Sequence, residues 1–311
     1  MNLKLPKEKQ VNETEEYKVF ANEIDYLINF FISFSELLFF NGRIISFISD
    51  KSIYTLNTNL IDSSVQTLRS IKQCCSIGCF SDANTLIRKL RDDLIQYVYI
   101  LNIINSRNPF IEEDLKKIKT DNPENFVNSF LSIRLNNNLT DDEKAISAWF
   151  SNTVSDLTRL LKRKLEFKNY MKVLKQNRYI TKILKEYKLE EYWENLRERL
   201  NDYVHNNGAK FSAYNLIKAN DKHLEIHLKN INIRTSYISS FFIVLILMID
   251  SSLISSTDYI DYLECDLEPP DDSQYFIASF IQDFIDAKVS KLHPELKQFL
   301  KDNNNYGMKI E

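Results

Sequence analysis

The stretch SDANTLIRKLRDDLIQYVYIL, from Ser81 to Leu101, shows most clearly how this chain folds. Its apolar residues recur every three or four positions, which places them on one face of a helix. They are Ala83, Leu86, Ile87, Leu90, Leu94, Val98 and Leu101. Ser81 is a favourable N-cap, and Asp82 follows at the positive end of the helix dipole. The stretch therefore predicts a long amphipathic helix whose polar face carries Arg88, Arg91, Asp92 and Asp93.

Most of the remaining chain has the same helical periodicity. We expect helices over residues 15–40, 60–77, 111–119, 140–175, 190–205, 237–249, 275–288 and 294–300, and another that begins at Pro123. The chain has only four glycines in 311 residues, where average usage of ~7% would give roughly 22. They are too far apart for a Walker-type phosphate loop or a dinucleotide-binding fingerprint, and tight β-hairpins also depend on glycine.

These observations predict an all-α protein. We expect a single mostly helical domain over residues 10–300, with a bundle core at 58–256 and an acidic loop followed by C-terminal helices at 257–311. One short segment departs from the helical pattern, because apolar and polar residues alternate in His223–Leu228. Alternation is typical of a half-buried strand. We therefore expect a small β-hairpin near residues 211–233, with 211–218 as its other strand.

The sequence favours a soluble protein. The four cysteines give no disulfide framework, and the polar N-terminus has no apolar signal segment behind it. The longest unbroken apolar run, Phe241–Ile249, has nine residues, far fewer than the ~20 that cross a bilayer. We interpret this run as a core helix and expect a cytoplasmic protein that does not span a membrane.

A net charge of −3 conceals a strong local asymmetry. Eleven Lys/Arg and two Glu lie between Arg159 and Lys188, whereas ten Asp/Glu and no Lys/Arg lie between Asp250 and Ala287. Three tyrosines, Tyr170, Tyr179 and Tyr187, interleave with the basic residues and could stack on bases. The basic stretch is either an ordinary solvated helix face or a nucleic-acid-binding surface. For the second case we expect contacts from Arg163, Lys164, Lys168, Lys172, Lys175 and Arg178.

The best candidate for chemistry is the segment LRERLNDYVHNNG, residues 196–208, at the end of a predicted helix. It contains Arg199 and His205 with five residues between them, and Asn201 four residues before His205. Histidine can move a proton at physiological pH, and a guanidinium presents a planar fork to phosphate oxygens. Six residues advance a straight helix by about 600°, which leaves Arg199 and His205 about 120° apart. They meet only where the helix frays or a second subunit supplies the partner, whereas Asn201 shares the face of His205 and is placed to orient its ring.

This arrangement resembles the Arg-x(4–6)-His motif of HEPN domains. The helix that begins Ser81–Arg88 and the later Tyr203-Val204-His205 are similar to segments of uncharacterised bacterial proteins of this type, so the resemblance covers about residues 58–208. It implies a helical, metal-independent ribonuclease in which two copies pair and bring both motifs into one cleft. Arg199 would then hold the scissile phosphate, His205 would act as general acid or base, and Asn201 would support them. The sequence departs from the commoner motif at Leu200, where a polar residue usually follows the arginine.

From the resemblance we expect an RNA endonuclease or RNA-binding effector, with a role in phage defence or in a toxin–antitoxin system. Its partners would be a second copy of the chain, RNA, and an antitoxin or effector protein. The alternative is a non-catalytic helical module that binds or regulates a protein partner. This alternative stays open because a histidine in the last turn of a helix is favourable for electrostatic reasons alone.

No other group of residues predicts a site. On a strand, His223, Glu225 and His227 would span about 13 Å, too far for all three to bind one metal ion. The cysteines at 74, 75 and 79 lack the partner pair of a zinc site, and the acidic residues of 264–272 lack EF-hand spacing. We therefore expect no metal and no cofactor.

Overall fold

The computed structural model describes residues 10–40, 45–49, 52–256, 262, 265–268, 270 and 275–311. Helices dominate this part of the chain, and its two named strands pair as one antiparallel hairpin, so the predicted all-α fold with a small hairpin is confirmed. The α-helices and strands are α1 (Glu15–Phe40), β1 (Ser46–Ile48), β2 (Ile53–Thr55), α2 (Asn59–Ser76), α3 (Phe80–Ser106), α4 (Glu112–Leu115), α5 (Pro123–Leu131), α6 (Asp141–Phe150), α7 (Arg159–Lys162), α8 (Phe167–Leu174), α9 (Arg178–Glu186), α10 (Leu189–Val204), α11 (Ala209–Ala213), α12 (Leu224–Asp250), α14 (Ser279–Ala287) and α15 (Leu296–Asn303). Short 3-10 helices are η1 (Val11–Glu13), η2 (Val154–Asp156), η3 (Arg163–Leu165), η4 (Ser251–Ile254) and η6 (Val289–Lys291).

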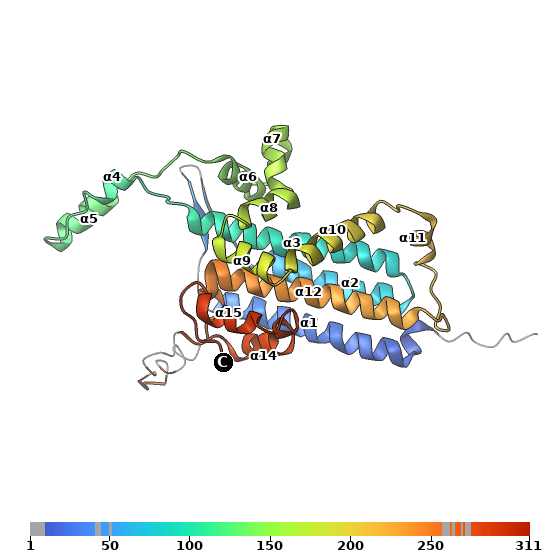
Figure 1. The fold of residues 1–311 in the computed structure, drawn as a ribbon. Helices are drawn as coiled ribbons and strands as arrows, with labels where there is room; N and C mark the ends of the chain where they lie inside the picture. The colour runs from blue at the N-terminus through green and yellow to red at the C-terminus, as the bar shows by residue number, and fades with distance from the viewer. Residues whose placement is uncertain are drawn as a thin grey trace, which may run out of the picture.

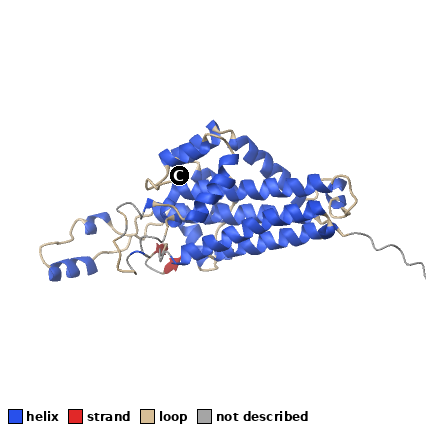
Figure 2. Cartoon of the chain, turned by 90° about the horizontal axis from the view of Figure 1, so that it is seen from below, coloured by secondary structure: helices blue, strands red, loops and turns tan. Residues whose placement is uncertain are grey.

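Four long helices, α1, α2, α3 and α12, lie side by side and form the body of the molecule (Figure 1, Figure 2). Helix α3 packs against α2 and α12 and also against α8 and α10. Its consecutive residues 97–101 are all buried, which a helix with a single apolar face would not allow. The helix predicted over 81–101 is therefore confirmed, and it lies at the centre of the fold.

Helix α12 is the apolar core helix that the sequence predicted, although it begins earlier, at Leu224. The segment Leu224–Ile254 is long and apolar enough to cross a membrane, but 94% of its most apolar window is buried inside the bundle. Phe241, Phe242 and every residue from there to Leu247 have no exposed surface. This placement is that of a core helix covered by the rest of the bundle.

The start of α3 is capped from a distant part of the chain. The predicted N-cap Ser81 lies inside the helix, and the side-chain oxygen of Asn215 accepts hydrogen bonds from the backbone N–H groups of Ser81 (2.9 Å) and Asp82 (3.1 Å). Gly78, which the sequence places just beyond α2, has a φ of +80°, and an added Cβ would lie 2.0 Å from the carbonyl oxygen of Ile217. The 208–217 connection therefore packs against the α2–α3 turn.

The position predicted for the β-hairpin was wrong. The hairpin lies at 46–55, and residues 211–233 form α11, a connection and the first part of α12. The alternation in His223–Leu228 is too short to distinguish a strand from a helix. Leu224, Leu228 and Ile231 also follow a helical spacing, and all three are buried. Ile226, which a strand would bury with Leu224, is 56% exposed.

The single helix predicted over 140–175 was also wrong. Its start is confirmed, since Thr140 and Glu143 form the expected capping box. The helix ends at Phe150, Asn152 adopts a left-handed φ of 58°, and Thr158 caps the new helix α7. The basic stretch is thus divided among α7, η3, α8 and α9, which turn relative to one another.

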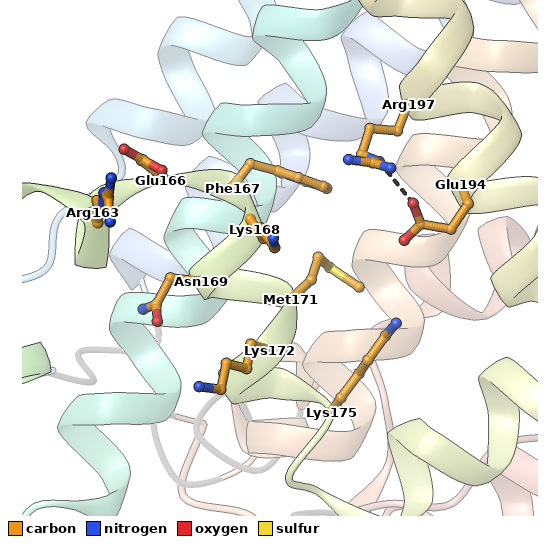
Figure 3. Close-up of a pocket in the computed structure, with 10 residues that line it drawn as sticks. All are labelled: Arg163, Glu166, Phe167, Lys168, Asn169, Met171, Lys172, Lys175, Glu194 and Arg197. Atoms are coloured by element: carbon orange, nitrogen blue, oxygen red, sulfur yellow. Dashed lines mark ion pairs between the residues drawn. The ribbon is translucent and has the colours of Figure 1, made fainter.

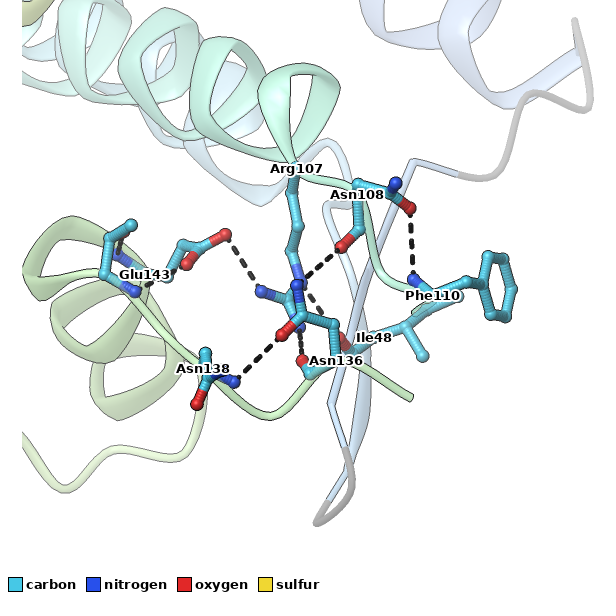
Figure 4. A network of polar contacts seen from close by, with 8 residues as sticks. Ile48, Arg107, Asn108, Phe110, Asn136, Asn138 and Glu143 are labelled. Atoms are coloured by element: carbon cyan, nitrogen blue, oxygen red, sulfur yellow. Dashed lines mark hydrogen bonds and ion pairs between the residues drawn. The ribbon is translucent and has the colours of Figure 1, made fainter. Parts of the chain in front are cut away.

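A buried arginine ties together one end of the bundle (Figure 4). The side chain of Arg107, 3% exposed, donates to the carbonyl oxygens of Ile48 (3.1 Å) and Asn136 (2.7 Å). It also pairs with Glu143 at 2.9 Å. These contacts join the end of α3 to the hairpin, to α6 and to the segment that carries α4 and α5.

We expect Arg107→Met to lower the free energy of unfolding by about 3–5 kcal/mol, because the buried Glu143 carboxylate would lose its cation. Urea unfolding followed by circular dichroism measures this change. Lys18→Met is the matched control, since Lys18 forms an exposed ion pair with Glu15 and its loss should change stability by less than about 1 kcal/mol. Equal effects of the two substitutions would contradict the role assigned to Arg107.

Candidate functional site

A pocket of about 580 Å³ lies between α8 and α10 (Figure 3). Helix α8 supplies five of its ten lining residues, and α10 supplies the facing wall. The lining residues are Arg163, Glu166, Phe167, Lys168, Asn169, Met171, Lys172, Lys175, Glu194 and Arg197. Five of them are cations and two are carboxylates, so the pocket carries a clear positive excess.

The cations of the pocket differ in how they are paired. Lys175 contacts Glu190 at 2.6 Å, and Arg197 contacts Glu194 at 2.7 Å, as Figure 3 shows for the second pair. Among the residues that the structure describes, Arg163, Lys168 and Lys172 have no carboxylate partner. These three exposed side chains are therefore free to bind an anion that enters the pocket.

The floor of the pocket is apolar and rests on a buried charge. Phe167 and Met171 form the floor, and the guanidinium carbon of Arg91 lies 4.0 Å from the centre of the Phe167 ring. Arg91 is 2% exposed and donates from Nε (2.8 Å) and Nη2 (2.6 Å) to Asp92, while its Nη1 has no hydrogen-bond partner. Burial lowers the pKa of Arg91, and the nearby Arg197 lowers it further, whereas Asp92 opposes both. A buried Arg91–Asp92 ion pair thus lies directly behind Phe167.

The orientation of α8 depends on Asp142 at the start of α6. This carboxylate accepts hydrogen bonds from the hydroxyl of Tyr99 on α3 (2.7 Å), from Lys164 (2.8 Å) and from Asn169 on α8 (2.9 Å). Burial raises the pKa of Asp142, but these three donors outweigh burial and hold it below its usual range. The charged form of Asp142 therefore fixes the wall of the pocket to the central helix.

The pocket brings together four of the six residues predicted to bind nucleic acid: Arg163, Lys168, Lys172 and Lys175. The other two lie elsewhere, because Lys164 pairs with Asp142 and Arg178 lies over the ring of Tyr179 at 4.7 Å. The predicted stacking role of Tyr170 was wrong. Its ring is 3% exposed and packs on Tyr99 at 4.6 Å, since α8 turns it toward α3.

The three residues of the predicted catalytic group lie in the last two turns of α10 and at its end. Arg199 and His205 are exposed, Asn201 is half-buried, and the backbone N–H of His205 donates to the carbonyl of Asn201 at 3.0 Å. The helix ends at Val204, and Asn206 is left-handed, with a φ of 48°. The expected ending of the helix at His205 is therefore present.

Helical geometry separates the catalytic group into two faces of α10. At 100° per residue, Arg197, Asn201 and His205 fall within about 80° of one another, on the side of the pocket. Arg199 lies about 120° from His205, toward Tyr192, whose pKa burial raises and Arg234 and Arg199 lower. No hydrogen bond joins Arg199 to His205 in the described chain. One copy alone thus places His205, and not Arg199, on the pocket side.

Sequence reasoning missed Arg197, Phe167 and Arg91 as parts of this site. Arg197 has a signal in the sequence, because it lies four residues before Asn201 and eight before His205, on one helix face. Arg91, expected on the polar face of its helix, lies four residues after Ile87 and four before Ile95, both fully buried. That spacing could have indicated its burial.

The other candidate metal ligands do not lie close together in the described part of the chain. Among the described residues, no group of three or more His, Cys, Asp or Glu side chains is arranged to hold a metal ion. His227 is half-buried between the rings of Phe80 (5.0 Å) and Tyr214 (4.8 Å), and burial lowers its pKa. Most of the acidic stretch 257–274 lies outside the described residues.

Comparison of the chain with known protein families, with curated proteins and with solved structures finds no match. The pocket and the residues along α10 are therefore the structural features that bear on function.

We expect Lys168→Glu/Lys172→Glu to lower the affinity for a single-stranded oligoribonucleotide at least tenfold, because it removes two unpaired cations from the pocket and adds two anions. Fluorescence anisotropy at several salt concentrations measures this, and the slope of log K against log salt should become shallower. The control is Lys116→Glu/Lys119→Glu, the same charge change on exposed residues near α4. An equal loss in both variants would show that only net charge matters.

Proposed function

We propose that this chain is a HEPN-like, metal-independent protein that binds and cleaves RNA. The observation that carries the proposal is the cationic pocket between α8 and α10, which lies on the same side of α10 as Asn201 and His205. Phosphate contacts from Lys and Arg side chains provide most of the affinity of proteins for RNA backbones. An RNA strand held in the pocket would continue along α10 to the exposed imidazole of His205.

In this proposal His205 performs the proton transfer. Taking the proton of an RNA 2′-hydroxyl allows the oxygen to attack the adjacent phosphorus, and the bond to the 5′-oxygen breaks. The products are a 2′,3′-cyclic phosphate and a 5′-hydroxyl, with the proton delivered to the leaving oxygen. A guanidinium that contacts the phosphate stabilises the charge that develops on its oxygens. The side-chain oxygen of Asn201, one helical turn before His205, is placed to orient the imidazole.

The roles of Arg199 and His205 require two copies of the chain. Because the two side chains lie about 120° apart on α10, we assign them to one composite site formed by a homodimer. In a two-fold pair each copy would supply the residue that the other presents on the wrong face. We place this activity in the cytoplasm, in a phage-defence or toxin–antitoxin setting, with an antitoxin or effector protein as a further partner.

We expect His205→Ala to reduce RNA cleavage at least 100-fold while its circular dichroism spectrum and melting temperature stay those of the wild type, because His205 is exposed. Gel analysis of a labelled oligoribonucleotide in the presence of EDTA measures cleavage. Arg199→Ala should behave in the same way, and mixing the two variants should restore part of the activity if two copies complete one site. A wild-type protein that neither binds nor cleaves RNA overturns the proposal.

A second candidate function has its own supporting observation. Helices α4 and α5 project away from the bundle (Figure 1, Figure 2), and α5 has no buried residue. Phe126, Val127, Phe130 and Leu131 are each at least 44% exposed, and the two phenyl rings lie 6.0 Å apart. Exposed apolar clusters of this kind are typical of protein-binding surfaces. A non-catalytic interaction module would use this projecting segment.

We expect Phe126→Gln/Phe130→Gln to lose any protein partner that co-purifies with the tagged wild type, since the substitution removes the apolar surface without changing the bundle. His205→Ala should keep the same partner and serves as the control. Affinity purification followed by mass spectrometry compares the three proteins. An unchanged partner in the double variant, or none in any of them, excludes this second function.

A further inference from the structure

The pocket between α8 and α10 combines two surfaces that an RNA backbone alone would not use together. Its rim is cationic, with Lys168 and Lys172 unpaired in the described chain, and its floor is the apolar pair Phe167 and Met171. Phosphates would contact the rim and leave the floor in water. The floor therefore indicates a ligand that carries a flat apolar group beside its negative charge.

The volume of the pocket suits a small ligand that carries such a flat apolar group. A volume of about 580 Å³ lies within the range of about 300–1,000 Å³ of small-ligand pockets. The guanidinium carbon of Arg91 lies over the Phe167 ring, 4.0 Å from its centre. An aromatic base that packs on Phe167 would extend a stack of guanidinium and phenyl ring, and aromatic side chains bind bases in this way whatever the base.

The wall of the pocket adds polar selectivity. Glu194 stands opposite α8 and holds Arg197, as Figure 3 shows. A carboxylate can accept hydrogen bonds from the amino group of a base, while the unpaired Lys168 and Lys172 contact the phosphate. A long acyl chain would leave the charged side chains of the pocket without a partner. A simple oligophosphate would leave the apolar floor without one.

We propose that this pocket takes one unstacked nucleotide, with its base on Phe167 and Met171 and its phosphate on the unpaired cations Lys168 and Lys172. The inference rests on the proposed function for its connection to RNA, and it names the substrate class as single-stranded RNA. Bases in a duplex are stacked and paired, so their faces cannot reach the floor. Arg197 and His205 are eight residues apart, about 12 Å along α10, so the nucleotide in the pocket is a neighbour of the cleaved one.

Methyl NMR tests this proposal on the wild-type protein. Of the four methionines, Met171 lines the pocket, and Met171→Leu assigns its signal. We expect AMP to shift the Met171 methyl resonance by ring current, and ribose 5-phosphate and inorganic phosphate to leave it nearly unchanged. By calorimetry AMP should bind at least tenfold more tightly than ribose 5-phosphate.

Two variants separate the base from the phosphate. Phe167→Leu should weaken AMP about tenfold and leave ribose 5-phosphate unchanged, whereas Lys172→Gln should weaken both. Equal affinities for the three ligands, no binding of AMP, or an unshifted Met171 methyl overturns the inference even if Phe167→Leu fails to fold. AMP binding without RNA cleavage removes only the proposed ribonuclease activity. Cleavage of single and double strands alike, with no base-dependent binding, removes only this inference.

Discussion

The rest of the structure depends on the burial of α3 on more than one side. Its residues Leu90, Leu94 and Leu101 are fully buried, and each side chain of this kind contributes about 1.5–3 kcal/mol of hydrophobic stabilisation. One side of α3 packs in the bundle with α2 and α12, and the other carries α8 and α10. Because both walls of the pocket rest on the same helix, their separation is set by side chains of α3 and not by a flexible loop.

The central helix also carries charge into the protein. Burying the guanidinium of Arg91 is costly unless a carboxylate and an aromatic ring compensate, and Asp92 and Phe167 supply both. A charge in this position is screened by solvent far less than a surface lysine. The ring contact that helps to compensate the buried Arg91 also places the Arg91–Asp92 ion pair directly beneath the pocket floor.

The broken course of the basic stretch converts a linear charge pattern into a concave one. Had residues 140–175 formed one straight helix, its cations would have spread around the helix and along its length. The left-handed residue Asn152 and the new start at Thr158 turn the chain, so that Arg163, Lys168, Lys172 and Lys175 surround one cavity. Helix α5 differs from α8, because it projects from the bundle and its apolar side chains are exposed.

The sequence by itself determined the helical class, the bounds of α1, the capping box at Thr140 and the apolar core helix, because periodicity and caps act within one or two turns. It also indicated the basic residues Arg163, Lys168, Lys172 and Lys175, which line the pocket, since composition is local. Only the tertiary structure decided which of these residues meet. Lys164 pairs with Asp142, Tyr170 turns inward, Arg91 is buried, and α12 replaces the predicted strand. Each outcome depends on contacts between segments far apart in the chain, and the six-residue alternation at His223 was outweighed by the burial of Leu224, Leu228 and Ile231 against the bundle.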